Sequence, residues 1–172
     1  MPEFQPGAPL PPHQPNCFGC GPRNQAGLHL RCHLTEAGVA GGFRLDTRHE
    51  GGPGIAHGGV VAAVLDDLFG FLLYRAGFPM VTARLEIDYK RPIAVEVDYA
   101  AEARIDSREG RKVWCSGELR DGEGTVVAAA RGLFLRVGVE HFARVSERAA
   151  GAIDHWKRES REGDAGPGPV GP

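Results

Sequence analysis

The sequence lacks the features that would direct the protein to nucleic acid, to a membrane or to the outside of the cell. Its formal net charge is only -2 over 172 residues, so no basic excess points to nucleic acid as the main partner. The opening residues, M-P-E-F-Q-P-G-A-P-L-P-P, have neither the basic nor the apolar region of a secretory signal. We therefore expect a soluble, cytoplasmic protein that binds neither nucleic acid nor a membrane.

Cysteine is also scarce, with four residues: Cys17, Cys20, Cys32 and Cys115. Without a secretory signal, these are better interpreted as reduced thiols than as a disulfide framework. With His13 and His33, three of them form the pattern H-x3-C-x2-C-x11-C-H, which offers enough ligands for zinc. The second C-x2-C pair of a typical zinc domain is missing, and His13 lies in a proline-rich leader. The sequence therefore favours reduced thiols and no metal.

The two ends of the chain have few large apolar side chains. Residues 1–15 contain six prolines and are expected to form an extended or flexible leader. Residues 161–172 are rich in glycine and proline and are expected to be disordered. Between them we expect one folded domain over residues 16–139, followed by a helix over residues 140–160, and we find no internal repeat.

The stretch from Gly51 to Arg75 organises the rest of the chain. A glycine-rich turn surrounds His57, and an apolar run then continues to Tyr74 with Asp66 and Asp67 as its only charges. The run is too long for a typical strand, so it predicts a helix. The helix is apolar nearly all round, which indicates burial or membrane insertion. Two central aspartates would cost roughly 2.5–3.5 kcal/mol each in a membrane, so we expect a buried core helix.

Strands are predicted on both sides of this helix. Two short candidates precede it and four runs with period-two alternation follow it, at Leu28–Leu34, Val39–Leu45, Val81–Arg91, Val95–Ile105, Lys112–Arg120 and Thr125–Val137. Such alternation is typical of antiparallel strands with one buried face. The predicted fold class is α+β, with a curved antiparallel sheet wrapped around one long helix. The final helical pattern would pack on the outside or on a partner subunit.

Four motifs in order carry a resemblance to a known family: C-F-G-C-G-P-R-N-Q-A-G-L-H-L at 17–30, H-G-G-V-V-A-A-V-L-D at 57–66, T-A-R-L-E-I-D-Y-K-R-P-I at 82–93 and E-G-R-K at 109–112. Over residues 16–137 the chain resembles the hotdog-fold acyl-CoA thioesterases, particularly the phenylacetate-pathway type. One departure is Gln25, where the family usually has proline in a loop. The resemblance implies hydrolysis of acyl-CoA, no cofactor beyond the coenzyme A of the substrate, and a homodimer, or a dimer of dimers, with active sites at the interface.

Asp66 is the favoured catalytic residue, as nucleophile or general base. It shares its helical face mostly with small residues, which leaves space for a ligand, whereas the face of Asp67 is bulkier. The resemblance adds that the family's catalytic acid falls at this offset after H-G-G. Asp67 is expected to be structural. For both, the alternative is a buried aspartate that bonds to backbone or to an arginine.

Four further positions are candidates at the same site. The amides of Gly58 and Gly59 would be unpaired donors at the helix start, suited to an oxyanion hole for a thioester carbonyl, although a plain glycine-rich turn is the alternative. The resemblance implies that His57 mainly shapes this turn, and that a hydroxyl near Thr82 positions the water or the carboxylate from the partner subunit. An ordinary strand threonine is an equally good interpretation of Thr82.

Basic and apolar side chains are candidates for substrate binding. The expected contacts to the phosphates of coenzyme A are Lys90, Arg91, Arg111 and Lys112, with Lys112 preferred and solvated surface charge as the alternative. Candidates for lining the acyl pocket are Phe69, Leu72, Leu73, Phe78 and Met80. They suggest an apolar acyl or aryl group and no more.

Two other functions are alternatives to hydrolysis. Hotdog enzymes that hydrate or dehydrate acyl thioesters pair a histidine with an acid in different motifs, which this sequence lacks. A non-catalytic acyl-CoA sensor would carry a DNA-binding module, for which neither the leader nor the tail has room. A carboxylate in the core, at Asp66, also argues against pure binding, because burying a charge without a use is costly.

Overall fold

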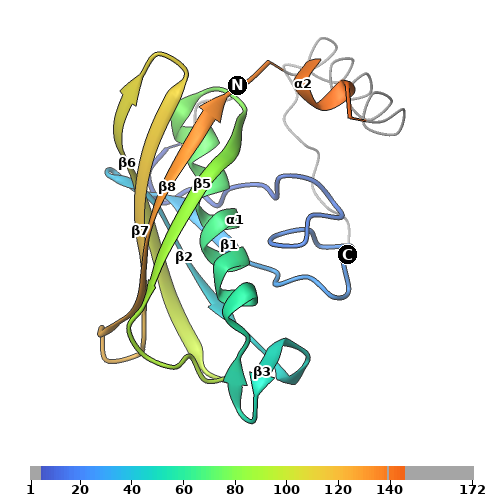
Figure 1. Ribbon diagram of the computed structural model, residues 1–172, viewed down its shortest axis with the longest axis vertical. Coiled ribbons are helices and arrows are strands. Elements are labelled where there is room, and N and C mark those ends of the chain that lie inside the picture. Colours follow the sequence, from blue (N-terminus) through green and yellow to red (C-terminus); the bar gives the residue numbers. More distant parts are fainter. Residues whose placement is uncertain (1–4, 139, 146–172) are drawn as a thin grey trace. The chain divides into compact units, whose positions relative to one another are not determined.

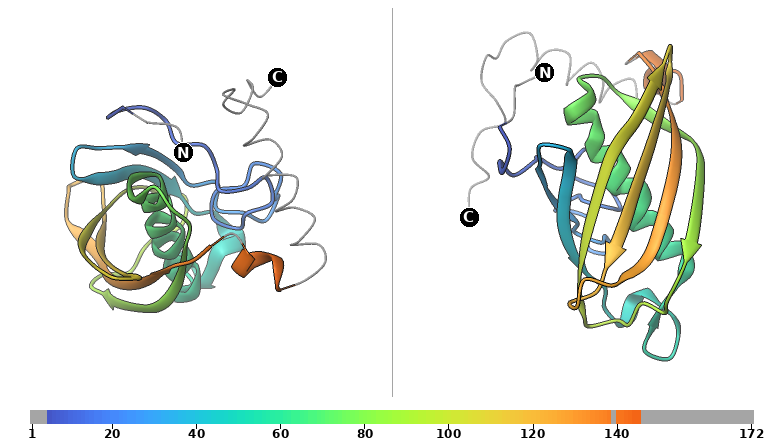
Figure 2. Two further views of the ribbon diagram at one scale, coloured as in Figure 1. Left: turned by 90° about the horizontal axis from the view of Figure 1, so that it is seen from above. Right: turned by 90° about the vertical axis from the view of Figure 1, so that its left-hand side faces the viewer.

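Helix α1, which spans Gly58–Ala76, is the element around which the sheet curves (Figures 1 and 2). The computed structural model describes residues 5–138 and 140–145. His57 caps the start of the helix, where its Nδ1 atom accepts a hydrogen bond of 2.9 Å from the amide of Gly59. Gly77 ends the helix in the left-handed conformation, with φ of 80°, and its amide donates to the carbonyl of Leu73. The predicted helix is confirmed.

The predicted antiparallel sheet is also confirmed. It has six strands in the order β1-β2-β6-β7-β8-β5, and every neighbouring pair is antiparallel. The strands are β1 (Arg31–Leu34), β2 (Gly38–Arg44), β5 (Met80–Tyr89), β6 (Asp98–Glu109), β7 (Lys112–Arg120) and β8 (Val126–Arg136). A separate two-stranded sheet of β3 (Glu50–Gly52) and β4 (Ile55–Ala56) follows the short helix η1 (Thr47–His49).

The second long strand after the helix begins later than its alternation predicted. The sequence favoured a start at Val95, but β6 starts at Asp98. Glu96 has a positive φ of 61°, and its amide donates to the carbonyl of Leu45 instead of to a strand neighbour. A turn with this geometry interrupts the extended backbone, although the side chains before it still alternate.

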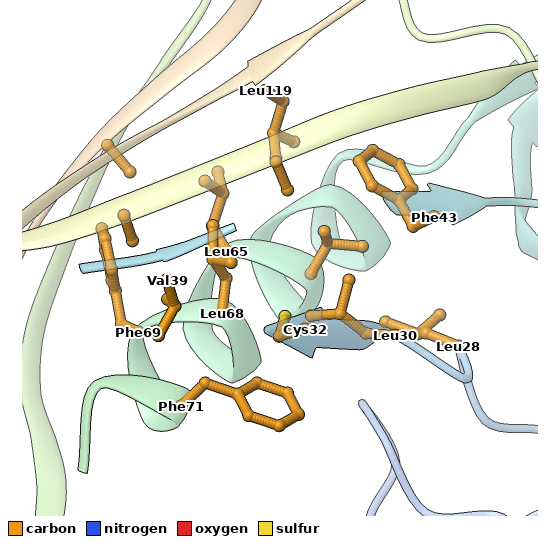
Figure 3. Close-up of a cluster of buried hydrophobic side chains, with 14 of the residues drawn as sticks. Leu28, Leu30, Cys32, Val39, Phe43, Leu65, Leu68, Phe69, Phe71 and Leu119 are labelled. Carbon is orange, nitrogen blue, oxygen red and sulfur yellow. The ribbon is translucent and has the colours of Figure 1, made fainter. Parts of the chain in front are cut away.

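The core lies between the concave face of the sheet and α1. Seven residues of the helix are buried, namely Val61, Val64, Leu65, Leu68, Phe69, Phe71 and Leu72. Figure 3 shows Phe69 among the buried side chains of this core. Phe69 packs edge-on against Phe134 of β8, with ring centroids 5.8 Å apart. A Cβ atom at Gly117 of β7 would lie 2.8 Å from the Phe69 ring, so the sheet uses a glycine where this ring approaches its backbone. Phe69 and Leu72 are fully buried core residues, which corrects their expected role in lining an acyl pocket.

The N-terminal segment, defined here as residues 5–30, covers a second face of α1, away from the sheet (Figures 1 and 2). Its start pairs with β1: the amide of Gly7 donates to Leu34, and the amide of Leu10 donates to Cys32. Leu10 is buried, and Pro9 forms an antiparallel bridge with His33. The expectation of a flexible leader is therefore corrected for residues 5–15, because the prolines lie between positions that make backbone hydrogen bonds.

Beyond β8, the described residues include one short helix, α2 (Glu140–Ala143). The remainder of the helix predicted over 140–160, and the tail over 161–172, lie outside the described residues. Among the described residues, none of the helices has the length and apolar character that crossing a membrane requires.

Candidate active site

Asp66 and Thr82 form a hydrogen-bonded pair between α1 and the edge strand β5. The hydroxyl of Thr82 donates to Oδ1 of Asp66 over 2.7 Å. Asp66 is half-buried and Thr82 is exposed, so the pair is open to solvent in one copy of the chain. The fold thus brings together two predicted site residues, Asp66 and Thr82, which lie on different elements.

A β-bulge helps to set this contact. The register of β5 against β8 shifts between Thr82, which pairs with Phe134, and Arg84, which pairs with Leu133. Ala83 is therefore an extra residue in β5, and bulges of this kind bend a strand and re-aim the side chains beside it. The resemblance implied a threonine that reaches across from a partner subunit, but the structure places this hydroxyl against the carboxylate of its own chain.

The start of α1 presents one free amide. The amide of Gly59 donates to the His57 side chain, so Gly59 is not available as an oxyanion donor in this arrangement. Among the described residues, no acceptor pairs with the amide of Gly58, and Gly58 is exposed. The Tyr89 hydroxyl donates to the carbonyl of Gly58 over 2.8 Å and so braces the turn. Sequence reasoning did not single out Tyr89, which lies within the predicted strand Val81–Arg91.

Asp66 and the Gly58 amide of one chain are too far apart to act on the same carbonyl. Eight residues separate them on α1, which corresponds to about 12 Å along the helix axis. An oxyanion donor has to lie within about 3 Å of the reacting oxygen. The two groups therefore belong to separate halves of the candidate site within one chain.

The four basic candidates fall into two pairs at opposite ends of the sheet. The amides of Lys90 and Arg91 both donate to the carbonyl of Val127, near the start of β8. Lys112 pairs with Leu135, near the end of β8. These two positions on β8 lie roughly 26 Å apart at the rise of an antiparallel strand. One chain does not bring the four residues together at a single pocket mouth.

Each basic pair lies beside one of the two half-sites. Lys90 and Arg91 follow Tyr89 directly, which bonds to Gly58. At the other end, Thr82 and Val113 both pair with Phe134, so the residue next to Lys112 lies level with the Asp66–Thr82 contact. The Gly58 half and the Asp66 half thus each have their own basic residues.

Two hollows on the surface of the domain lie away from Asp66. One of about 530 Å³ is lined by residues such as Leu28, Arg48 and Tyr99. The other, of about 970 Å³, lies over the sheet and is lined by residues such as Lys90, Arg104 and Glu118. Neither hollow includes Asp66, so neither matches a cavity in which this carboxylate would meet a substrate.

The neighbouring carboxylate, Asp67, has entirely different surroundings. Its Oδ1 atom lies 3.0 Å from Nδ1 of His13 and 3.2 Å from Sγ of Cys17. Sγ of Cys20 lies 3.3 Å from Nδ1 of His13 and 3.7 Å from Oδ1 of Asp67. We call these four residues the His-Cys-Cys-Asp cluster. Asp67 was expected to be structural, and its partners were missed because His13 was assigned to a flexible leader.

Burial and hydrogen bonding both shift the pKa values of this cluster. Burial raises the pKa of Asp67 above its ordinary range. For His13, burial alone would lower the pKa, but the hydrogen bonds with Asp67 and Cys17 outweigh it and raise the pKa to about 9. Cys32, from the predicted zinc pattern, is buried with its pKa raised to about 12 by burial, and it lies outside the cluster. His33, its neighbour on β1, is exposed.

Comparisons with known proteins agree with this fold. Residues 53–128 match the family model described as the Thioesterase superfamily. The human protein named acyl-coenzyme A thioesterase THEM5 is 36% identical over 93 residues, which cover 53% of this chain and 37% of that protein. The chain thus matches less than half the length of this curated relative.

Solved structures give the same result. A thioesterase superfamily protein with 29% sequence identity superposes with a TM-score of 0.67, over 70% of this chain and 60% of that one. The PaaI protein of E. coli, from the phenylacetic acid degradation operon, has 20% identity and a TM-score of 0.60, over 64% of this chain and 81% of its own. The family model, the relatives and the sheet wrapped around one helix all agree that this chain has the hotdog fold and that residues 53–128 are similar to the thioesterase superfamily.

Proposed function

We propose that this protein hydrolyses the thioester of an apolar acyl- or aryl-CoA to the free acid and coenzyme A. The observation that carries the proposal is the Asp66–Thr82 pair, a half-buried carboxylate held by a hydroxyl at an open sheet edge. The curated relative named above supports the substrate class, because its name is that of an acyl-coenzyme A thioesterase. Coenzyme A enters as part of the substrate, and the proposal needs no further cofactor.

Asp66 supplies the reactive group in either of two routes. As a general base, it takes a proton from a water that attacks the thioester carbonyl. As a nucleophile, it attacks the carbonyl itself and forms an anhydride that water then hydrolyses. In both routes the carbon–sulfur bond breaks, and the thiolate of coenzyme A leaves and is protonated. The Thr82 hydroxyl donates a hydrogen bond to Oδ1 of Asp66. It thereby orients the carboxylate and leaves Oδ2 available for reaction.

The complete site is proposed to form between two copies of the chain. A carbonyl attacked by Asp66 needs an oxyanion donor, and the Gly58 amide of the same chain is about 12 Å away along α1. If Asp66 of one copy meets Gly58 of the other, both groups can reach one carbonyl. The exposed edge strand β5, which carries Thr82, is available for this association. We propose a homodimer, with a dimer of dimers as the higher assembly.

The same arrangement would unite the basic residues. Lys90 and Arg91 lie beside the Gly58 half-site, and Arg111 and Lys112 lie beside the Asp66 half-site. Joining the two halves from different copies brings one pair of each kind to the mouth of the pocket, where they would hold the phosphates of coenzyme A. The part-exposed side chains of Leu73, Phe78 and Met80 remain candidates for contact with the acyl group.

Release of the coenzyme A thiol from a panel of short, medium, long and aryl acyl-CoAs tests the activity. The Asp66→Asn variant keeps the shape of the side chain but removes the charge, and we expect its turnover to fall by about 10³-fold. Asp88→Asn is the matched control, because Asp88 is an exposed aspartate on β5. No turnover on any member, or an Asp66→Asn variant as active as wild type, would contradict the proposal. Binding without turnover would instead indicate an acyl-CoA sensor.

Mixed dimers test whether the site is shared. Gly58 is the first helical residue, and His57 before it has an extended backbone with ψ of 133°, so proline fits at position 58. Gly58→Pro therefore removes the amide donor without breaking the helix. We expect Gly58→Pro and Asp66→Asn each to be inactive alone. Refolded together, they should recover about a quarter of wild-type activity, because half the dimers would contain one intact site. No recovery would place the whole site in one chain.

The thiol content supports the proposed cytoplasmic location. Cys17, Cys20, Cys32 and Cys115 are all free, and three of them are buried. Reduced thiols of this kind persist in the cytosol, where disulfides are rare. Fluorescence imaging of the tagged full chain in its own cell would test the location.

A further inference from the structure

We propose that His13, Cys17, Cys20 and Asp67 bind one zinc ion, which fastens the N-terminal segment to helix α1. Each of the four residues offers one ligand atom, and these atoms all lie within 4.8 Å of one another. The proposal concerns a different face of α1 from Asp66 and does not rest on the proposed thioesterase activity.

The spacing of the donor atoms matches tetrahedral coordination. Ligands at the usual zinc distances of about 2.0–2.3 Å lie roughly 3.3–3.8 Å from one another at the corners of a tetrahedron. In the cluster, the imidazole–carboxylate distance is 3.0 Å, and the contacts of the sulfur atoms with Oδ1 of Asp67 and Nδ1 of His13 span 3.2 to 3.7 Å. A zinc ion therefore needs only small side-chain movements to sit between the four donors.

The charges of the cluster also indicate a cation. The side chain of Asp67 is only 9% exposed, and three donor groups converge on its Oδ1 atom. Its Oδ2 atom is buried and has no hydrogen-bond partner among the described residues. A buried carboxylate oxygen without a partner is costly, and a metal ion bound to this carboxylate lowers that cost. With two thiolates, one carboxylate and a neutral imidazole, Zn²⁺ would leave a net charge of about −1.

A nearby cation can balance that remaining charge. The guanidinium of Arg31 donates to the backbone carbonyl of Cys20 over 3.1 Å, which keeps its positive charge beside the sulfur ligands. The backbone amide of His13 also donates to Sγ of Cys20 over 3.3 Å. Contacts of this kind orient and stabilise a thiolate ligand from its second shell.

The chain around the cluster is shaped to bring the donors together. A Cβ atom at Gly19 would lie 2.0 Å from Cγ of Asp67, so the turn between the two cysteines packs its backbone directly on this carboxylate. At Gly21 a Cβ atom would lie 2.3 Å from the amide nitrogen of Cys17, and the Gly21 amide donates to the Cys17 carbonyl. The C-F-G-C-G motif thus forms a tight turn that points both sulfur atoms at Asp67.

The ligand set favours zinc and a structural role. Two thiolates with an imidazole in a tetrahedral arrangement select soft or borderline metals, and zinc suits this combination. All four corners of the tetrahedron are filled by protein, whereas catalytic zinc sites keep one position for water or substrate. Because the ligands come from residues 13–20 and from position 67, the metal would cross-link the N-terminal segment to α1.

The test begins with wild-type full-length protein and does not depend on any variant folding. Reduced protein, refolded in metal-free buffer, would be titrated with Zn²⁺ and, separately, with Co²⁺ as a spectroscopic probe. We expect one equivalent of metal per chain, thiolate-to-cobalt charge-transfer bands, the intense visible bands of tetrahedral cobalt, and a rise in Tm that a chelator reverses. Absence of bound metal, or a Cys17–Cys20 disulfide formed in its place, would overturn the proposal.

Matched variants then assign the ligands. Cys20→Ser and Asp67→Asn should lower metal affinity by at least tenfold, whereas Cys115→Ser, which alters a buried cysteine on β7, should leave one equivalent bound. Asp66→Asn should also keep its metal. Metal binding can therefore be interpreted even if the protein proves not to be a thioesterase. Full metal content in the Cys20→Ser and Asp67→Asn variants would place the ion elsewhere and reject the cluster.

Discussion

Asp66 and Asp67 are adjacent in sequence, yet they face two opposite kinds of environment. Asp66 lies on the side of α1 that meets the open sheet edge, accepts one hydrogen bond from Thr82 and is half-buried. Asp67 lies under the N-terminal segment, where its side chain is 9% exposed and is surrounded by His13, Cys17 and Cys20. Consecutive residues of a helix point about 100° apart, so one step along the chain separates the two environments.

The difference shows how one helix can serve chemistry and architecture at once. A carboxylate that reacts with a substrate has to be held but accessible, as Asp66 is. A carboxylate that fastens one segment of the chain to another has to be enclosed by its partners, as Asp67 is. We therefore expect changes on the Asp66 face to reduce turnover with little effect on stability, and changes on the Asp67 face to do the reverse.

Replacing each aspartate by asparagine should give the largest effects and tests this division directly. Asp66→Asn should lower kcat by about 10³-fold and leave Tm within a degree or two of wild type. Asp67→Asn should lower Tm by several degrees and keep most of kcat at temperatures where the protein is folded. Steady-state kinetics and calorimetry on the same preparations would measure both. If the two variants lost activity equally, the two faces would not be functionally separate.

A methyl group at Gly19 should disturb the Asp67 face alone. Its Cβ atom would lie 2.0 Å from Cγ of Asp67, so the turn or the helix has to shift. We expect Gly19→Ala to lower the free energy of unfolding by about 1–3 kcal/mol, as measured by urea denaturation with an unchanged m-value. Gly52→Ala is the control, because an added Cβ atom there meets nothing within 4 Å. Equal stability of the two variants would contradict the close packing of Gly19.

The hydroxyl of Thr82 offers a smaller test on the Asp66 face. Thr82→Val keeps the shape of the side chain but removes its hydrogen bond to the carboxylate. Since a hydrogen bond to a charged group contributes about 1.5 kcal/mol or more, kcat/KM should fall about tenfold. Thr82→Ser should restore most of it. Failure of serine to rescue would show that the methyl group of Thr82, and not its hydroxyl, is what the site needs.

Tyr89 should give the smallest effect, because it acts on the other half-site through one exposed contact. Tyr89→Phe removes the hydrogen bond to the carbonyl of Gly58 but keeps the ring that lies against the turn. A neutral hydrogen bond at an exposed position contributes under about 1 kcal/mol, so kcat should fall only two- to threefold. A loss larger than that of Thr82→Val would mean that positioning the Gly58 amide matters more than orienting Asp66.

Much of the fold could be predicted from local pattern. The long apolar run identified α1, and period-two alternation identified the strands, because both periodicities follow directly from which face of an element is buried. The start of α1 was also predictable, since the glycine-rich turn precedes the apolar run without a break, whereas the cap that His57 forms on the helix was not predicted. Asp66 was singled out by the small residues on its helical face together with the resemblance to the hotdog thioesterases, and Thr82 by that resemblance alone.

The rest depended on contacts that no local pattern carries. The leader was predicted to be flexible because it is rich in proline, and no local pattern indicates that Gly7 and Leu10 pair with β1. That error also hid the partners of Asp67, which lie 47 to 54 positions away in sequence. The bulge at Ala83 and the separation of the two basic pairs follow from sheet register, and register is set only once the whole sheet has formed.

The attachment of residues 7–10 to β1 has a consequence for how copies of this chain can associate. One side of the sheet ends in a stretch that contains Pro9, Pro11 and Pro12, and proline has no amide hydrogen to offer to an incoming strand. The opposite side ends in β5, whose outer edge can pair with an incoming strand. Two copies that join through β5 use up the accessible edge of each, so strand addition would close at a pair and could not propagate into a fibre.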